Sequence, residues 1–470
     1  MTPLAALVAA APGSLVLPPG ERRAQIAVPE PLRLLDSADL GRGRHIAVVE
    51  DAAGARWTVP LVVEADLVRR AVPGDGVAEG LVRGIADVRR MHRDRGSAST
   101  LEGAAMQGHS AFVADGWHAE EVGGERGITV DQTNESVVVG ERAMVKWAVH
   151  LPRAGVRGAQ PAAARLASLM AADFAETPRP WGLLHWIDEV GDPHDLAHIL
   201  LASVTSYLPG AQDGWDWAVD DVARAARGET GLDDALAAPR RLGALTARMH
   251  VALAAQSGEQ RADAGLVTRW RERALADLDE AGAAVTGPEG ERLRAQAPRI
   301  AAAYDAFAQC EGTPLIAVHG DYHVGQVLRS PSDDPALRWS YAVTDFDGNP
   351  VLPAQERSAP QPAALDVAGM LASLDHVGRV VNRRVEGADP EVVRTWLAAA
   401  QEGFSYEYRD TLARTGHGNL LDERLLAPLR LQQEVREHLY AVRHLPHWVY
   451  VPDAALAALL PVPDEGAQRC

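Results

Sequence analysis

The chain has 470 residues and a formal net charge of −18, which argues against nucleic acid or an anionic membrane surface as a partner. The sequence contains no uninterrupted run of about 18 apolar residues, which is the length that an ordinary membrane span requires. Two cysteines, Cys310 and the terminal Cys470, are too few for a disulfide framework, so the sequence predicts a protein of the reducing cytoplasm.

The N-terminal part, residues 1–95, predicts a small β-rich domain. Apolar runs at residues 46–50 and 57–63 are typical of strands, and turns that contain Gly and Asp separate them. The segment at residues 91–100 is polar, which is typical of a linker. We therefore expect a domain boundary near residue 95.

A single lysine is the most unusual feature of the composition. Lys146 is the one lysine among 46 basic residues, and it lies in VVVGERAMVKW, residues 137–147, which predicts a β-hairpin. Arginine is a planar fork, so it cannot replace the compact ammonium of a strand lysine that contacts nucleotide phosphates. Chance survival of a lysine on an exposed strand face explains the observation equally well. Lys146 alone therefore leaves both interpretations open.

Two motifs farther along the chain favour phosphoryl transfer. An apolar run of strand length, residues 315–318, leads into HGDYHVGQ, in which Gln326 follows Asp321 by five positions. A second strand-like run, residues 341–344, leads into DFDG, which begins at Asp345. The kinase template has the same order. In it, an Asp accepts the hydroxyl proton, an amide five positions later binds magnesium, and a second Asp also binds magnesium.

The chemistry of such a reaction requires these residue types. A hydroxyl group is a poor nucleophile, so a carboxylate such as that of Asp321 must orient it and take its proton. Magnesium neutralises the ATP phosphates and prefers carboxylate and amide oxygens, such as those of Asp345 and Gln326. Each motif alone is compatible with a plain turn at the end of a strand. Their order after Lys146 predicts a kinase that uses ATP and Mg²⁺, with Asp321 as the catalytic residue.

The motifs and their order resemble the maltokinase and aminoglycoside-phosphotransferase branch of the protein-kinase-like fold, over nearly the whole chain. The matching stretches are QTNESVVV at residues 132–139, LPGAQDGW at 208–215, RMH at 248–250, DVAGML at 366–371, and the single residues Glu437, Tyr440, Arg443 and Trp448. Two departures from maltokinases are DFDGNP at residues 345–350 and LQQEVREH at residues 431–438. Together they look like the sister group of actinobacterial glucosamine kinases.

The resemblance implies an α/β (α+β), protein-kinase-like bilobal fold. It places a β-rich N-terminal cap at residues 1–95 and a small nucleotide-binding lobe at residues 96–206. A mostly helical C-terminal lobe with the catalytic loop and the sugar site follows at residues 207–470. The implied reaction is transfer of the γ-phosphate of ATP to the 6-hydroxyl of glucosamine. A maltokinase is the alternative, followed by an aminoglycoside phosphotransferase or a non-catalytic pseudokinase, and the oligomeric state is left open.

The resemblance also implies the nucleotide contacts. Lys146 would contact the phosphates. Gln132 and Ser136 would lie in the segment that takes the place of a glycine-rich loop. In the last strand of the small lobe, backbone groups of Val204 and Ser206 would meet the adenine.

The C-terminal helix predicted over residues 425–444 carries the implied sugar contacts. Its apolar stripe consists of Leu431, Val435, Leu439 and Val442. The opposite face consists of Gln433, Glu437, Tyr440 and His444. Such a face is usually only solvated, but the resemblance makes this helix a wall of the sugar site. A carboxylate there would pair with a protonated 2-amine, and an amide would bind hydroxyl groups.

Further candidates lie close to Asp321 in the sequence. His323 would contact the sugar, or it would be a buried histidine bonded to the backbone. Asp347 would be a second magnesium or substrate contact, or it would only cap a turn. We expect His319 to tie the catalytic loop to the Asp345 segment, and we expect His250 to pack behind that loop.

Overall fold

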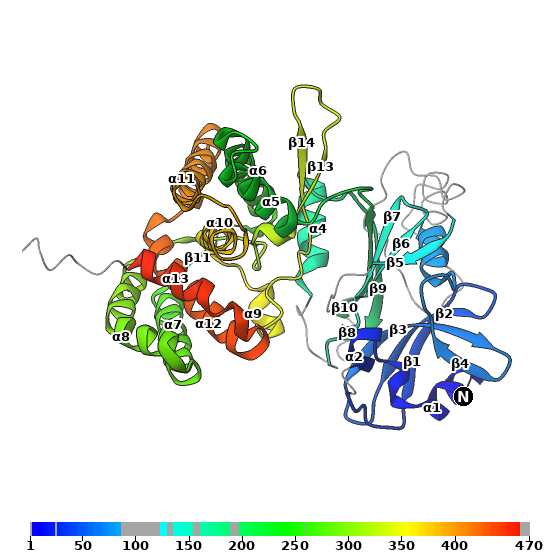
Figure 1. The fold of residues 1–470 in the computed structure, drawn as a ribbon. Helices are drawn as coiled ribbons and strands as arrows, with labels where there is room; N and C mark the ends of the chain where they lie inside the picture. The colour runs from blue at the N-terminus through cyan, green and yellow to red at the C-terminus, as the bar shows by residue number, and fades with distance from the viewer. Residues whose placement is uncertain are drawn as a thin grey trace, which may run out of the picture. The chain divides into compact units, whose positions relative to one another are not determined.

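A computed structural model describes residues 2–23, 26–85, 123–128, 135–153, 160–188, 197–258 and 260–460 (Figure 1). The chain divides into two compact units. The sheet unit comprises Met1–Met170, Thr177–Gly210 and Leu352–Ser358. The helical unit comprises Ala171–Glu176, Ala211–Val351 and Ala359–Cys470. Strands dominate the first unit and helices the second, which confirms the predicted α/β (α+β) class.

The sheet unit contains two antiparallel five-stranded sheets. The first consists of β1 (Arg33–Asp39), β2 (Arg44–Glu50), β3 (Arg56–Glu64) and β4 (Leu67–Arg70) in that order, with β8 (His150–Leu151) paired to β3. The second has the order β5 (Glu125–Gly127), β6 (Glu135–Val139), β7 (Ala143–Trp147), β10 (Ala197–Ser206) and β9 (Pro180–Asp188). The helices are α1 (Pro3–Ala10), α2 (Pro19–Arg23), α4 (Pro161–Ala171), α9 (Ala354–Ser358) and one over residues 77–85.

One hydrophobic core runs through both sheets of this unit. Val59 on β3 and Val204 on β10 belong to the same buried cluster, and both are fully buried. Each fully buried aliphatic side chain of this kind contributes about 1.5–3 kcal/mol. Since residues 86–122 lie outside the described part of the chain, the predicted boundary between a cap and a small lobe stays a prediction.

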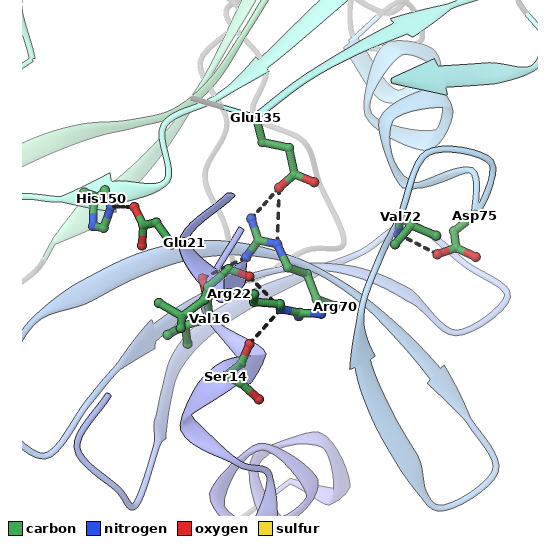
Figure 2. Close-up of polar contacts among 10 residues, drawn as sticks. Ser14, Val16, Glu21, Arg22, Arg70, Val72, Asp75, Glu135 and His150 are labelled. Atoms are coloured by element: carbon green, nitrogen blue, oxygen red, sulfur yellow. Dashed lines mark hydrogen bonds and ion pairs between the residues drawn. The ribbon is translucent and has the colours of Figure 1, made fainter. Parts of the chain in front are cut away.

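A buried ion pair joins the two sheets (Figure 2). Arg70, at the end of β4, donates through Nε and Nη2 to Oε2 of Glu135 at the start of β6. Its Nη1 donates to the Val16 carbonyl at 3.0 Å. The Arg70 side chain is 2% exposed and that of Glu135 10%. These charges are desolvated, so each depends on the other for a partner.

Replacing Arg70 by Ala is expected to destabilise the sheet unit by about 3 kcal/mol, because Glu135 then remains in its desolvated place without that cation. The matched control is Arg69→Ala on the same strand. Arg69 is 45% exposed in its pairs with Glu64 and Asp75, so its loss should cost at most about 1 kcal/mol. Urea unfolding followed by circular dichroism measures both variants. Equal losses for the two would contradict the prediction.

The helical unit is built mainly of long helices. They are α5 (Gly214–Ala226), α6 (Leu232–Ser257), α7 (Ala264–Ala284), α8 (Gly287–Tyr304), α10 (Ala364–Arg384), α11 (Pro390–Arg414), α12 (Leu426–His444) and α13 (Tyr450–Leu459). Asp213, Asp263 and Asp389 cap α5, α7 and α11 by accepting hydrogen bonds from first-turn amides. Helix α10 runs through the middle of the unit, packed against α5, α11, α12 and α13 (Figure 1). No helix in the described part of the chain is long and apolar enough to cross a membrane.

Two small antiparallel pairs of strands complete the helical unit. Strands β11 (Gln260–Arg261) and β12 (Pro314–Leu315) are distant in sequence and form one, whereas β13 (Val327–Pro331) and β14 (Trp339–Val343) form a hairpin. The strand predicted at residues 315–318 is therefore wrong beyond Ile316, which forms an isolated bridge with Gln361. The amide of Ala317 donates to Ser257 Oγ at 2.9 Å, so a side chain takes the place of a neighbouring strand.

Candidate active site

One buried carboxylate anchors the loop that carries Asp321. Asp366, at the start of α10, accepts hydrogen bonds from the His319 amide at 2.7 Å and the Gly320 amide at 2.8 Å. His250 on α6 contacts the same carboxylate through Nε2 at 3.1 Å. Burial opposes ionisation of Asp366, but the His250 contact and the Gly320 amide hold its pKa below the ordinary value. The loop is thus anchored to the core of the unit.

His250 and His319 take the structural positions expected of them. His250 Nδ1 lies 2.7 Å from the Tyr408 hydroxyl, and the His250 side chain is fully buried. His319 Nε2 lies 2.8 Å from the Thr344 carbonyl, which directly precedes Asp345. The imidazole of His319 therefore links the catalytic loop to the DFDG segment.

Gln326 and Asp345 lie side by side at one end of the β13–β14 hairpin. Val327 pairs with Val343, and the Thr344 amide donates to the Gln326 carbonyl at 2.8 Å. Asp345 is exposed and has a φ of +63°, a left-handed conformation that Asp adopts more easily than most residues. The hairpin explains why residues 19 positions apart meet.

The donor set at this end of the hairpin fits a magnesium ion. Asp345 offers a carboxylate and Gln326 an amide, both oxygen donors. In the described part of the chain, no group of three or more His, Cys, Asp and Glu side chains could enclose a metal by itself. Magnesium commonly keeps several waters and binds substrate phosphates in addition to one or two carboxylates. A sparse protein donor set is therefore suitable for this ion.

Asp321 is half-buried and electrostatically coupled to neighbouring carboxylates. Burial raises its pKa to about 7, with further contributions from Asp345, Glu437 and Asp366. A general base works best when its pKa lies near the working pH. The charges of Asp345 and Glu437 thus both act on Asp321, and a site shared by the three residues stays a prediction.

His323 and Asp347 have different surroundings. His323 Nδ1 accepts a hydrogen bond from the Gly325 amide at 3.1 Å, the backbone contact that was one of its two predicted roles. Burial lowers the pKa of His323 to about 4, helped by His319, so its imidazole is neutral. Nε2 then carries the proton, and it lies 3.5 Å from Gln326 Nε2. Asp347 is half-buried in the turn after Phe346, and its role stays a prediction.

Helix α12 confirms the predicted apolar stripe. Leu431, Val435 and Leu439 are buried in the core, and Val442 packs against that core. The opposite face divides into two parts. Gln433 and Glu437 are half-buried and bonded to each other, Nε2 to Oε1 at 3.1 Å, whereas Tyr440 and His444 are exposed. Burial, not helical spacing alone, therefore separates a half-buried polar pair from two surface residues on this face, and the sugar contacts of the pair stay a prediction.

Two tryptophans stand beside this site, and the sequence singled out only one of them. Trp448 is half-buried, with its ring edge-on to Trp215 at 5.9 Å between centroids. Trp215 lies in the first turn of α5. A Cβ on the neighbouring Gly214 would come within 1.7 Å of the Val324 carbonyl oxygen, so only glycine lets α5 approach the catalytic loop this closely. The stretch LPGAQDGW was the signal that could have revealed Trp215.

A cavity of about 400 Å³ lies elsewhere in the helical unit. It is lined by residues of α5, α6 and the β13–β14 hairpin, among them Asp221, Arg241 and Trp339. None of the predicted site residues lines it. The candidate site therefore rests on converging polar groups rather than on this cavity.

Two of the predicted nucleotide residues, Lys146 and Ser136, lie in one row across three strands of the sheet unit. Lys146 on β7 pairs with Ser136 on β6 and with Ser203 on β10, so the three side chains face the same side of the sheet. Ser136 is thus part of a strand and not of a loop, which corrects its expected position. It pairs directly with the lysine strand. Ser203 is an additional member of the row that the sequence did not single out.

The other predicted nucleotide residues are less well placed for side-chain contacts. Val204 is fully buried in the core, so only its backbone can meet a ligand. Ser206 donates its amide to the Arg179 carbonyl and accepts the Arg179 amide on Oγ, both at 2.8 Å. Gln132 lies outside the described residues. Their contacts with adenine or phosphate stay predictions.

Comparisons with known proteins cover almost the whole chain, although no protein-family model matches it. The chain is 58% identical over 456 residues to a glucosamine kinase of Streptacidiphilus jiangxiensis, covering 97% of each. It is 42% identical over 434 residues to a glucosamine kinase of Mycolicibacterium smegmatis, covering 92% of this chain and 98% of the relative.

Solved structures show the same likeness in three dimensions. A glucosamine kinase in crystal form B aligns with a TM-score of 0.83 at 54% identity, covering 97% of this chain and 99% of that one. A glucosamine kinase in complex with glucosamine, ADP and inorganic phosphate aligns with a TM-score of 0.81, at the same identity and coverage. These likenesses show that the chain has the fold of the solved glucosamine kinases.

Proposed function

The chain belongs to the glucosamine kinase family and is a phosphotransferase, and on this basis we propose that it transfers the γ-phosphate of ATP to the 6-hydroxyl of glucosamine. The observation that carries the proposal is a half-buried carboxylate on α12, Glu437, which Gln433 orients and whose charge acts on Asp321. One carboxylate serves a hydroxyl and the other serves an amine. A related structure that contains glucosamine with ADP supports this choice of substrate.

Glu437 is the proposed partner of the amino group. It is a half-buried carboxylate already oriented by Gln433, so it can accept from a protonated amine with little loss of side-chain freedom. Gln433 has its amide oxygen left for a sugar hydroxyl, and His323 can donate from Nε2 to another. The half-buried Trp448 offers an apolar surface beside these polar groups.

Asp321 is the proposed acceptor of the 6-hydroxyl proton. With a pKa of about 7 in the free enzyme, it is partly protonated at neutral pH. A bound ammonium or metal cation nearby favours the charged form of a carboxylate. Binding of the substrates would therefore ionise Asp321 at the stage at which it has to accept a proton.

The phosphate groups of ATP require cationic partners. We propose that Lys146 supplies one of these cations. The hydrogen bonds to the nucleotide would come from Ser136, Gln132 and the backbone of Val204 and Ser206. Asp345 and Gln326 would hold magnesium, which would neutralise charge on the transferring phosphoryl group.

A cytoplasmic location suits this chemistry and the chain. ATP and sugar are both small cytoplasmic metabolites for a kinase of this kind, and Cys310 is a free, buried thiol. Burial raises the pKa of that thiol, which keeps it unreactive. The location stays a prediction.

An assay of ATP turnover against glucosamine, glucose, maltose and kanamycin tests the proposed function. We expect the highest kcat/KM for glucosamine, with the phosphate on carbon 6 as determined by NMR of the product. An enzyme that phosphorylates maltose and ignores glucosamine would overturn the substrate while leaving the reaction class. An Mg²⁺-independent reaction would overturn the metal assignment.

Replacing Glu437 by Gln is expected to lower kcat/KM for glucosamine by about 10- to 150-fold, the value of a charged hydrogen bond of about 1.5–3 kcal/mol. Glucose has a neutral hydroxyl at that carbon and should lose much less. The matched control is Glu423→Gln, an exposed carboxylate just before α12, which should change neither sugar. Equal losses for both sugars in the Glu437 variant would make Glu437 a structural residue.

A further inference from the structure

One face of α10 contacts first the loop that carries Asp321 and then helix α12. Asp366, Gly369, Ser373 and His376 follow at intervals of three or four residues, so they share that face. Asp366 binds the His319 and Gly320 amides. A Cβ on Gly369 would lie 2.7 Å from the Tyr322 carbonyl oxygen.

The next two residues of this face complete the series. Ser373 Oγ accepts the Val324 amide at 3.0 Å, which is the last contact with the loop. One turn later, His376 Nε2 lies 2.9 Å from Glu434 Oε2 on α12. Helix α10 therefore sets the spacing between the Asp321 loop and the helix that carries Glu437.

The His376–Glu434 pair is deeply buried, at 5% and 1% side-chain exposure. Burial disfavours a charged imidazole, but the carboxylates of Glu434, Glu437 and Asp375 raise the pKa of His376 to about 9. His376 is thus the cation of this cluster at neutral pH. Its ring also stands edge-on to Trp448, with centroids 6.5 Å apart.

The other titratable groups around this pair are few. Helix α12 contributes Arg430, Glu437 and His438, and burial lowers the pKa of both Arg430 and His438. Arg430 still stays charged at neutral pH, and it acts with His376 against the burial that raises the pKa of Glu434. The catalytic loop contributes His323, whose imidazole is neutral. Arg379 on α10 is bonded to Asp375. His376 is therefore the cation in direct contact with Glu434.

We propose that His376 is a positioning residue for substrate choice, which neutralises Glu434 and thereby leaves Glu437 ionised for the ammonium group of glucosamine. The proposal rests on the proposed function, because it takes Glu437 as the partner of the amine. Glu434 and Glu437 are three residues apart on α12, so they are neighbours on the helix surface. Glu434 is buried and Glu437 half-buried, so two charges this close are hard to keep once the cation in contact with Glu434 is removed, and one of them would then take up a proton.

The electrostatics of Glu437 agree with this role. Burial raises its pKa, His376 opposes that rise, and Glu434 adds to it. Without His376 the pKa of Glu437 would rise further, because the opposing cation is gone and the like charge remains. A protonated Glu437 has no charge to attract an ammonium. If His376 and the charge of Glu434 are removed together, their opposite effects on the pKa of Glu437 should largely cancel.

The test compares His376→Gln with the double variant His376→Gln/Glu434→Gln, in full-length enzyme. In the single variant we expect kcat/KM for glucosamine to fall about tenfold, mainly through KM, which corresponds to about one pKa unit of Glu437. Glucose kinetics and KM for ATP should change less than about twofold. The acid limb of kcat/KM for glucosamine should move to higher pH, since Glu437 takes up its proton at a higher pH.

In the double variant, two amides replace the ion pair and can still bond to each other. We expect the glucosamine preference and the acid limb to return to within about threefold and half a pH unit of the wild type. A double variant as defective as the single one would overturn the proposal, and so would a single variant that loses glucosamine and glucose equally. If His376→Gln does not fold, the double variant alone decides by the same criterion.

The Glu437→Gln variant separates this proposal from the proposed function. If Glu437→Gln shows no selective loss of glucosamine, the assignment of the amine partner fails and this proposal with it. If Glu437→Gln is selective and His376→Gln is not, only the role of His376 fails.

Discussion

Replacing Asp321 by Asn is expected to lower kcat by about 10²–10⁴-fold while ATP binding stays nearly unchanged. The amide has the size of the carboxylate but cannot accept the proton of the sugar hydroxyl. The loop itself is held through backbone amides of His319 and Gly320 bonded to Asp366, so the substitution leaves its anchor intact. Steady-state kinetics with glucosamine and ATP measure the effect. A variant that keeps more than about a tenth of wild-type kcat would exclude Asp321 as the base.

The raised pKa of Asp321 gives this variant two further signatures. In the wild type, kcat/KM should fall as pH drops through about 7, because the carboxyl group of the free enzyme is then protonated. The Asn variant should lack that limb. The unfolded chain releases the same proton near pH 4, so wild-type stability falls as pH rises from about 4 to 7, because the folded state still holds a proton that the unfolded chain has already released. The Asn variant should therefore be the more stable protein at pH 8.

Replacing Asp345 by Asn is expected to remove nearly all magnesium-supported turnover. Asn tolerates the left-handed backbone of this position as well as Asp does, so the fold should stay intact while the charged ligand is lost. Gln326→Ala should keep some activity but raise the magnesium concentration needed for half-maximal rate, since it removes a neutral ligand. Titration of the rate with Mg²⁺ measures both variants.

The matched control for the metal site is Asp347→Asn, two positions along the same turn. It should shift the magnesium titration less than Asp345→Asn, if Asp345 is the ligand. Unchanged titrations in Asp345→Asn and Gln326→Ala would refute the site. Loss of activity in Asp347→Asn alone would move the ligand to Asp347.

Local patterns predicted the elements that depend on neighbouring residues. The hairpin at residues 137–147 exists as β6 and β7, with Val137 paired to Val145, because alternation along a strand is readable from the sequence. The stripe on α12 exists because helical spacing fixes which side chains share a face. The order of the chemical motifs was likewise readable from the sequence, and the resemblance that it carries indicated the family.

Contacts between distant segments could not be predicted from such patterns. Asp366 holds His319 across 47 residues, and His376 meets Glu434 across 58. No periodicity links these pairs, so the anchoring face of α10 emerged only from the fold. The same reason explains the short β12. The side chain of Ser257 binds the amide of Ala317, which the apolar run alone would have assigned to a strand.

The common core of the sheet unit has a consequence for how this enzyme can be divided. Val59 and Val204 come from the two ends of the unit's sequence and pack in one cluster, so removing the N-terminal segment would leave the apolar side of the nucleotide strands facing water. Fragments that begin near β5 should therefore aggregate rather than fold. If the β5–β10 sheet is exchanged between relatives, the β1–β4 sheet therefore has to be transferred with it, because the two sheets share one core.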